Sequence, residues 1–170
     1  MDTQQIQAIA QWYDTAPLHD PQADMAYASL AEECRYLATI LRDRHRVRRV
    51  LTNRPDTYSS LRELTASIED DKKIYTFNGG EPHPLWTRHD NTTFRFVHDY
   101  YGHYLGKCTF RSLDGELKAF ASQAKRHNNI SLPALAAEVV GQICWFYTHG
   151  RVYAPQKAVC MPEEYWRPLL

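Results

Sequence analysis

The stretch His98-Asp99-Tyr100-Tyr101-Gly102-His103 places two imidazoles five residues apart, with a carboxylate next to the first. The residues around it are mostly apolar. Burying an imidazole there costs free energy unless the ring has a hydrogen-bond partner or binds a metal ion. Glu138 lies further along the chain, in another apolar run. Two histidines and one carboxylate leave coordination positions open, and this ligand set is typical of non-haem Fe(II) oxygenases and of some zinc hydrolases. We therefore expect His98, His103 and Glu138 to hold a metal ion, Fe(II) first and Zn²⁺ as the alternative.

The five-residue spacing sets a condition on this site. At 100° per residue, His103 lies about 140° round an α-helix from His98, so one ion can bind both only if the helix distorts or ends near Gly102. Asp99 precedes His103 by four residues, on nearly the same helix face, so Asp99 and His103 are an alternative ligand pair. Otherwise we expect Asp99 to handle protons beside the metal. Without a metal, each histidine would bond a backbone carbonyl in the core.

A later helix carries polar side chains at helical spacing, which predicts a polar pocket wall, with a solvated face as the alternative. The members of this stripe are Ala134, Glu138, Gln142, Trp145 and His149. Gln142 follows Glu138 by one turn and can hold that carboxylate or the substrate. Glu116 is a backup carboxylate, although its place in a first helical turn also suits it to offset the helix dipole.

Aromatic side chains near these ligands predict the kind of substrate. We expect Tyr100, Tyr101 and Trp145 to line an apolar pocket for an aromatic or heteroaromatic small molecule, either an amino acid or a nucleobase or nucleotide. Lys157 can supply a contact to an anionic group of that molecule, and a surface lysine is the alternative interpretation.

Helices must position most of these residues. Apolar spacing predicts helices around residues 6–13, 25–44, 60–68, 93–105, 113–127 and 132–148, with a short one around 155–159. Two β-branched runs, 47–52 and 73–77, predict strands that pair as a small edge sheet, and 81–92 reads as an ordered loop. The expected fold is mainly α with a minor two-stranded β element (α+β), a single-domain helical bundle around a metal site. Within the domain 1–170, residues 1–80 would form the scaffold and 81–170 would carry the site.

The composition narrows the class of protein. At 170 residues the chain suits one domain. Lysine plus arginine and aspartate plus glutamate both number 20, so no overall field favours nucleic acid or a membrane. A cluster of arginines is a candidate nucleic-acid contact, but arginines at a helix end also offset the dipole and solvate a face, so this contact is not our leading expectation. Its members are Arg42, Arg44, Arg46, Arg48 and Arg49.

The expected location is the cytoplasm, or the host cytoplasm for a phage-encoded chain. The first residues lack the basic and apolar regions of a signal peptide, and no apolar run approaches the roughly 20 residues of a membrane span. The four cysteines are far apart in the sequence, and we expect them to be reduced thiols.

The string His-Asp-Tyr-Tyr-Gly-His resembles the iron motif His-Glu-x-x-Gly-His of the pterin-dependent aromatic amino acid hydroxylases. That family's third ligand is a glutamate on a later helix, which implies iron ligation by His98, His103 and Glu138. The segment Asp114–Gln123 is similar to the family's intervening segment. The resemblance further implies a monooxygenase-like reaction, a pterin co-substrate, and a place for Asp99 near that pterin.

The chain departs from this family in three respects. Asp99 stands where the family has glutamate, the chain is much shorter than the family's catalytic domain, and the family's upstream pterin-binding loop has no counterpart. The chain also resembles a group of small bacteriophage proteins to which no activity is attached. The residues that carry this second likeness are Asn91, Phe94, Arg95, Val97, His98, Asp99, Gly102, His103, Gly115, Glu116, Glu138, Gly141, Gln142, Gln156 and Lys157.

Three functions follow from these residues. The first is a non-haem Fe(II) oxygenase or hydroxylase. The second is a zinc-type metallohydrolase that uses the same ligands, with Asp99 or Glu116 as general base. The third is a metal-free phage accessory protein that binds a partner and whose polar residues only hold the core together.

Overall fold

A computed structural model describes residues 1–55, 57–110 and 112–170. It is mainly helical with one two-stranded sheet, which confirms the expected fold class. The α-helices are α1 (Thr3–Thr15), α2 (Asp24–Asp43), α3 (Leu61–Glu69), α4 (Arg88–Val97), α5 (Leu113–Ala124), α6 (Leu132–Ala136), α7 (Gln142–Thr148) and α8 (Glu163–Trp166). Two short 3-10 helices, η1 (Pro21–Ala23) and η4 (Arg167–Leu169), and two π-helices, η2 (His98–Tyr104) and η3 (Ala137–Gly141), complete the helical segments described.

Side-chain caps determine where several of these helices begin. The Asp2 carboxylate accepts from the backbone N–H of Gln5, whose own side chain accepts from the backbone N–H of Asp2. The Ser60 hydroxyl caps α3, and the Ser112 hydroxyl accepts from the backbone N–H of Gly115 in α5. Each cap satisfies an N–H group that has no partner inside the helix. The start of α5, at Leu113, is thereby fixed three residues before Glu116.

The sheet joins two distant strands in parallel. Strands β1 (Arg48–Thr52) and β2 (Lys73–Phe77) pair in the register Arg48 to Lys73 through Thr52 to Phe77. A parallel pair needs a crossover connection, and α3 lies within it. The predicted pairing of these two strands across their connecting helix is confirmed.

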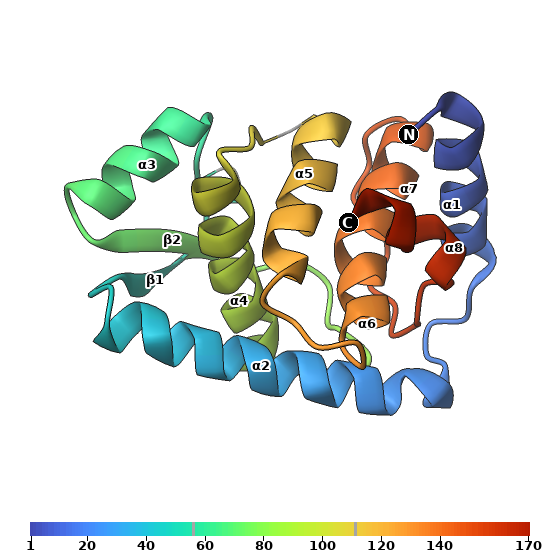
Figure 1. Cartoon of the computed structure of the whole chain (residues 1–170), viewed down its shortest axis with the longest axis horizontal. Coiled ribbons are helices and arrows are strands. Elements are labelled where there is room, and N and C mark those ends of the chain that lie inside the picture. Colours follow the sequence, from blue (N-terminus) through green and yellow to red (C-terminus); the bar gives the residue numbers. More distant parts are fainter. Residues whose placement is uncertain (56, 111) are drawn as a thin grey trace.

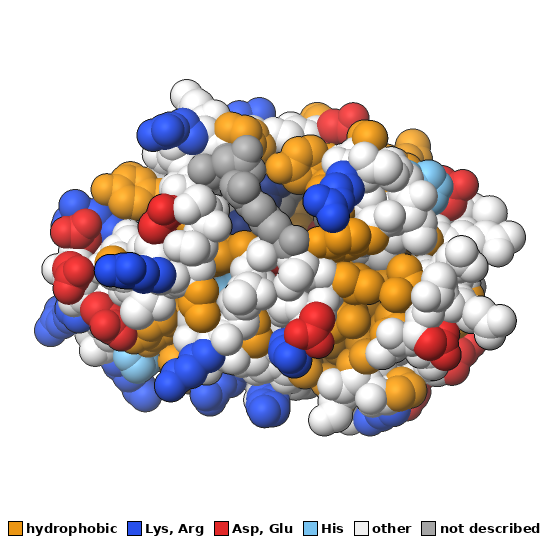
Figure 2. Space-filling view, turned by 90° about the horizontal axis from the view of Figure 1, so that it is seen from above, with side chains coloured by type: hydrophobic (Ala, Val, Ile, Leu, Met, Phe, Trp, Pro, Cys, Tyr) orange, Lys and Arg blue, Asp and Glu red, His pale blue; other side chains and the backbone are white. Residues whose placement is uncertain are grey.

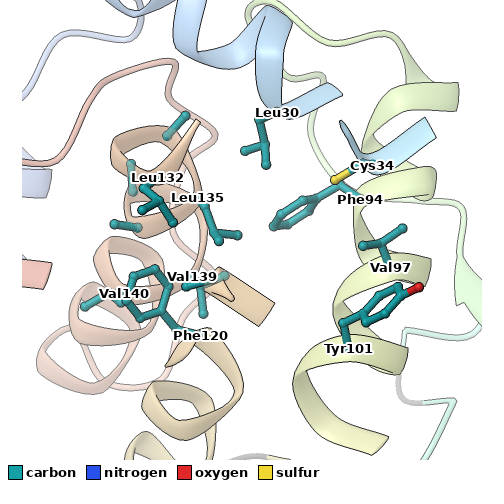
Figure 3. Close-up of a cluster of buried hydrophobic side chains, with 14 of the residues drawn as sticks. Leu30, Cys34, Phe94, Val97, Tyr101, Phe120, Leu132, Leu135, Val139 and Val140 are labelled. Carbon is teal, nitrogen blue, oxygen red and sulfur yellow. The ribbon is translucent and has the colours of Figure 1, made fainter. Parts of the chain in front are cut away.

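The remaining helices form a row above α2 (Figure 1). Helix α2 runs along the lower edge of the molecule, while α4, α5 and α6–α7 stand side by side above it, with α1 beside α7 and the sheet at the opposite end. The core lies between α2 and this row (Figure 3). Its labelled side chains come from α2, α4–η2, α5 and α6–η3, and are Leu30, Cys34, Phe94, Val97, Tyr101, Phe120, Leu132, Leu135, Val139 and Val140.

Two helices that the apolar spacing predicts as continuous α-helices each contain a π-helical segment. Segment η2 follows α4 directly, and segment η3 lies between α6 and α7. A π-helix forms i→i+5 hydrogen bonds, and such segments are frequent at functional sites. Segment η2 contains both histidines of the motif, and η3 contains Glu138.

Two predictions about element boundaries are wrong. Residues 88–92 belong to α4 and not to a loop, because Thr87 caps the helix by accepting from the backbone N–H of Asp90. Residues 155–159 form no helix. Instead, residue 158 forms a parallel bridge with His19, and the Lys157 ammonium reaches the end of α1, so this segment is extended. The short C-terminal helix is α8.

No helix in the described part of the chain combines the length and the apolar character that a membrane span requires. The four cysteines are free, and Cys34, Cys108 and Cys144 are buried.

Candidate metal centre

His98, His103 and Glu116 meet at one point between η2 and α5. One ligand atom from each of the three lies within 4.8 Å of the other two. The Glu116 Oε2 atom is 3.5 Å from His98 Nε2 and 3.4 Å from His103 Nε2. All three side chains are shielded from solvent, with exposed fractions of 13%, 2% and 17% for His98, His103 and Glu116. Two nitrogens and one oxygen thus converge in a space of the size that a single ion occupies.

The Nδ1 atom of each ring, which points away from Glu116, already has a hydrogen-bond partner. His98 Nδ1 lies 2.7 Å from Gln123 Oε1, and His103 Nδ1 lies 3.2 Å from the carbonyl oxygen of Cys108. A carbonyl oxygen only accepts, so each Nδ1 carries the proton and each Nε2 of a neutral ring directs a lone pair at Glu116. With both rings neutral, two lone pairs and a carboxylate face one another, and a cation between them would remove this repulsion. This pattern of outer hydrogen bonds is also the one that metal-binding histidines show. The donor set therefore fits a divalent metal ion.

The π-helix explains how two histidines five residues apart share one site. In an i→i+5 ladder, residue i+5 lies close to one turn beyond residue i, so the separation that an α-helix would impose disappears. The two ring centroids are 4.9 Å apart and the rings are nearly perpendicular, at 84°. Gly102 allows α5 to pack closely, because a Cβ there would lie 3.2 Å from both the Cβ and the carbonyl oxygen of Ala119.

In the metal-free protein, the pKa shifts favour a protonated His98 beside an ionised Glu116. Burial alone would lower the pKa of His98, but the hydrogen bond and the charge of Glu116 outweigh it and raise this pKa above 6.5. Burial opposes ionisation of Glu116, yet the two imidazoles lower its pKa to about 2. Burial raises the pKa of Asp99 to about 6, although His103 and His98 oppose the shift. A carboxylate that stays ionised between two imidazoles is suited to bind a cation.

A cavity of about 740 Å³ opens beside this cluster, and His98, Asp99 and Glu116 are in its wall. Both halves of the chain line it, since Tyr58, Tyr75 and Phe77 come from the first 80 residues. Aromatic rings make up much of the remaining wall and include Phe94, Phe110, Phe146, Tyr147 and Tyr153. Figure 2 shows the molecule from above, where hydrophobic side chains gather over the right half of this face.

Glu138 is placed apart from the two histidines of the motif. Its Oε1 accepts from the Tyr27 hydroxyl at 2.8 Å and lies 3.2 Å from His83 Nε2, and its Oε2 accepts from Gln142 Nε2 at 2.8 Å. His83 Nδ1 accepts backbone N–H groups at 3.1 and 3.0 Å, so its proton is on Nε2 and is donated to Glu138. Three donors thus satisfy this carboxylate. Glu138 and Gln142 line the same cavity as the cluster.

The expected substrate-binding residues lie elsewhere. Tyr100 and Tyr101 are buried, and neither is among the described residues that line the cavity. Trp145 donates to Asp14 and stacks on His149. Lys157 is buried and donates to three backbone carbonyls at the end of α1, so it is neither a surface lysine nor part of the cavity wall.

The arginine cluster is partly engaged in contacts within the protein. Arg42 pairs with Asp43, and Arg49 donates to the hydroxyl groups of Thr92 and Thr93. Figure 2 shows basic side chains along the lower left edge of this face, with acidic side chains among them.

The sequence analysis did not identify Gln123, which contacts His98 Nδ1, or His127, which contacts Gln123 in turn. The signal was present, because positions 116, 120, 123 and 127 follow helical spacing and share a face. His83 and Tyr27, which hold Glu138, come from a loop and from α2. No spacing rule links these two to Glu138.

Comparisons of the chain with protein-family models, with curated proteins and with solved structures give no match.

Proposed function

We propose that the protein is a metal-dependent enzyme of the non-haem Fe(II) oxygenase type, with His98, His103 and Glu116 as its metal ligands. The observation that carries this proposal is the convergence of two Nε2 atoms and one carboxylate oxygen, with both Nδ1 atoms committed to carbonyl acceptors. Two histidines and one carboxylate are the ligand set of such centres. Bound Fe(II) would supply open positions for O₂ and for a substrate or co-substrate.

The chain's own residues define what the site would bind. The cavity has the size of a small-molecule site and its wall is rich in aromatic rings, which favours a planar aromatic or heteroaromatic substrate. Asp99, next to His98 on the cavity wall, would move a proton in this reaction. Gln142 holds the Glu138 carboxylate at the same wall. A pterin co-substrate stays an expectation of the family resemblance alone.

A zinc hydrolase is the second candidate, because the same three ligands suit Zn²⁺ with an open water position. The observation that favours it is Asp99, a carboxylate on the cavity wall that is not among the three converging ligands. In this case Asp99 would act as general base toward a water molecule. Glu116, which faces both imidazoles, would be a ligand and not the base.

Metal analysis of anaerobically purified protein tests both candidates. We expect one iron per chain in the wild type, and loss of most of it in His98→Ala, His103→Ala and Glu116→Gln. The matched control for Glu116→Gln is Asp114→Asn, since Asp114 lies in the same helical turn but is exposed and pairs with Lys118. This control should keep its metal.

Other results of the metal analysis would favour a different function or a different third ligand. Stoichiometric zinc, with turnover that needs no O₂, would favour the hydrolase. Loss of metal in Glu138→Gln but not in Glu116→Gln would move the third ligand to Glu138, as the sequence alone suggests. A folded wild type that binds neither metal would leave the metal-free binding protein.

A further inference from the structure

A buried chain of hydrogen bonds runs from His98 to α2. His98 Nδ1 is 2.7 Å from Gln123 Oε1, Gln123 Nε2 is 3.2 Å from His127 Nε2, and His127 Nδ1 is 2.7 Å from Glu33 Oε2. Gln123 is fully buried, and so is the side chain of His127. These hydrogen bonds thus link His98, a candidate metal ligand, to the Glu33 carboxylate on α2. The two side chains between them are shielded from water.

The direction of every hydrogen bond in this chain follows from its far end. A carboxylate only accepts, so His127 carries a proton on Nδ1 and donates it to Glu33. Burial lowers the pKa of His127, although Glu33 opposes this, so the ring is neutral and its Nε2 is a lone pair. That lone pair accepts from the amide nitrogen of Gln123. The amide oxygen then faces His98 and accepts from its Nδ1–H.

Glu33 is itself held in place. Its Oε1 accepts from the backbone N–H of Asn128 at 3.1 Å, and its Oε2 accepts from the Ser131 hydroxyl at 2.6 Å. These contacts fix the carboxylate against the segment that joins α5 to α6, next to His127. Glu33, which sets the direction of these hydrogen bonds, is therefore held in place independently of the metal ligands.

We propose that Glu33, His127 and Gln123 are positioning residues that fix the tautomer and orientation of His98, so that its Nε2 lone pair points at the metal. This inference rests on the proposed function and extends it to three residues outside the cavity wall. If the Gln123 amide were reversed, its NH₂ group would face Nδ1 and would favour a proton on Nε2, the atom that must bind the metal. Substitution of a residue that holds a metal-binding histidine in this way typically lowers metal affinity by 10–100-fold.

The test measures Co²⁺ affinity by competition with a chelator, together with the visible absorption of the Co²⁺-loaded protein. We expect Gln123→Leu to bind Co²⁺ about 10–100-fold more weakly, with an altered absorption spectrum. Gln123→Glu keeps an acceptor for His98 Nδ1–H and should restore most of the affinity. Lys118→Ala is the matched control: Lys118 lies on the same helix as Gln123 but is exposed and pairs with Asp114, so the Co²⁺ affinity of this variant should equal that of the wild type.

Imidazole nitrogen NMR of the wild type gives an independent readout that needs no variant to fold. We expect the Zn²⁺-loaded protein to carry the His127 proton on Nδ1 and the His98 proton on Nδ1. A His127 proton on Nε2, or a folded Gln123→Leu protein with unchanged Co²⁺ affinity and spectrum, would overturn the positioning role alone. A wild type that binds neither Co²⁺ nor Zn²⁺ would overturn the proposed function as well.

Discussion

The two imidazoles of the candidate centre are held by partners of different kinds. His103 Nδ1 faces a backbone carbonyl, that of Cys108, whereas His98 Nδ1 faces the side chain of Gln123. Substitution of a neighbouring side chain can remove the second partner but not the first. Variation around the site should therefore act mainly through His98.

The charged pair in the metal-free protein gives a pH prediction. The raised pKa of His98 contributes stability that is present below pH 6.5 and is lost as the pH rises through the folded-state value. The lowered pKa of Glu116 contributes stability that is present above pH 4.5 and is lost as the pH falls toward about 2. The pair therefore stabilises the metal-free protein most between pH 4.5 and 6.5.

Metal binding, in contrast, becomes stronger as the pH rises above 6.5, because the imidazoles must be deprotonated to bind the ion. We expect a chelator to lower the melting temperature more at about pH 7.5 than at about pH 5.5. Thermal melts with and without chelator at the two pH values measure this. Glu116→Gln is the control and should show no chelator effect at either pH. A larger effect at the lower pH would contradict metal binding by these histidines.

The sequence indicated the two histidines but not which carboxylate faces them. Their types and spacing predict a shared site on one segment, and the structure brings the two rings together. Glu138 and Glu116 lie on different helices, and residue spacing within a helix does not say how two helices are rotated against each other. The packing of α5 against η2 decides this, and it depends on contacts such as that of Gly102 with Ala119.

At the scale of elements, apolar periodicity predicted helices and strands better than it predicted their irregularities. The α2 pattern extends over the whole observed helix, and both strands fall where β-branched residues predict them. The π-helices were not predicted, because one extra residue within a turn leaves the apolar pattern almost unchanged. The start of α4 could have been predicted, since Thr87 followed by Asp90 three residues later is a capping pattern.

The start of α5 gives a prediction at this scale. A Cβ at Gly115 would lie 2.0 Å from the carbonyl oxygen of Thr109, so Gly115→Ala must push the preceding loop or the helix aside. We expect a loss of about 1–3 kcal/mol in the free energy of unfolding, measured by urea denaturation. We also expect weaker metal binding, because Glu116 follows directly.

Lys118→Ala is the control for this variant, since Lys118 lies on the same helix and is exposed. Its ion pair with Asp114 is exposed too, and such pairs contribute about 1 kcal/mol or less. Equal stability of the two variants would show that the loop at Thr109 yields without cost.

At the scale of the whole molecule, Lys157 joins the last third of the chain to the first helix. Its ammonium group donates to the carbonyl oxygens of Tyr13, Asp14 and Ala16 at 2.6, 2.8 and 2.6 Å. These carbonyls lie at the end of α1, where helix geometry leaves such groups without partners. Lys157 therefore serves as a C-terminal cap that comes from a distant part of the sequence.

Lys157→Met should lower the free energy of unfolding by roughly 3 kcal/mol, because charge-assisted hydrogen bonds are lost and buried carbonyls are left without a donor. Chemical denaturation measures the change, and metal content should stay at the wild-type level because Lys157 does not face the cluster. Arg167→Met, at an exposed ion pair with Glu163, is the matched control and should change stability by about 1 kcal/mol or less. A loss of metal in folded Lys157→Met would contradict this separation of roles.

The same contact bears on the order in which the protein assembles. A chain folds as it is synthesised from its N-terminus, yet α1 receives its cap from residue 157 and packs against α7. Closing a loop this long is entropically costly and slow. Segments α2 to η2 contact one another earlier along the chain and can associate first. Helix α1 can therefore be fixed in its final place only after residue 157 has been made, and until then the face that packs against α7 stays uncovered.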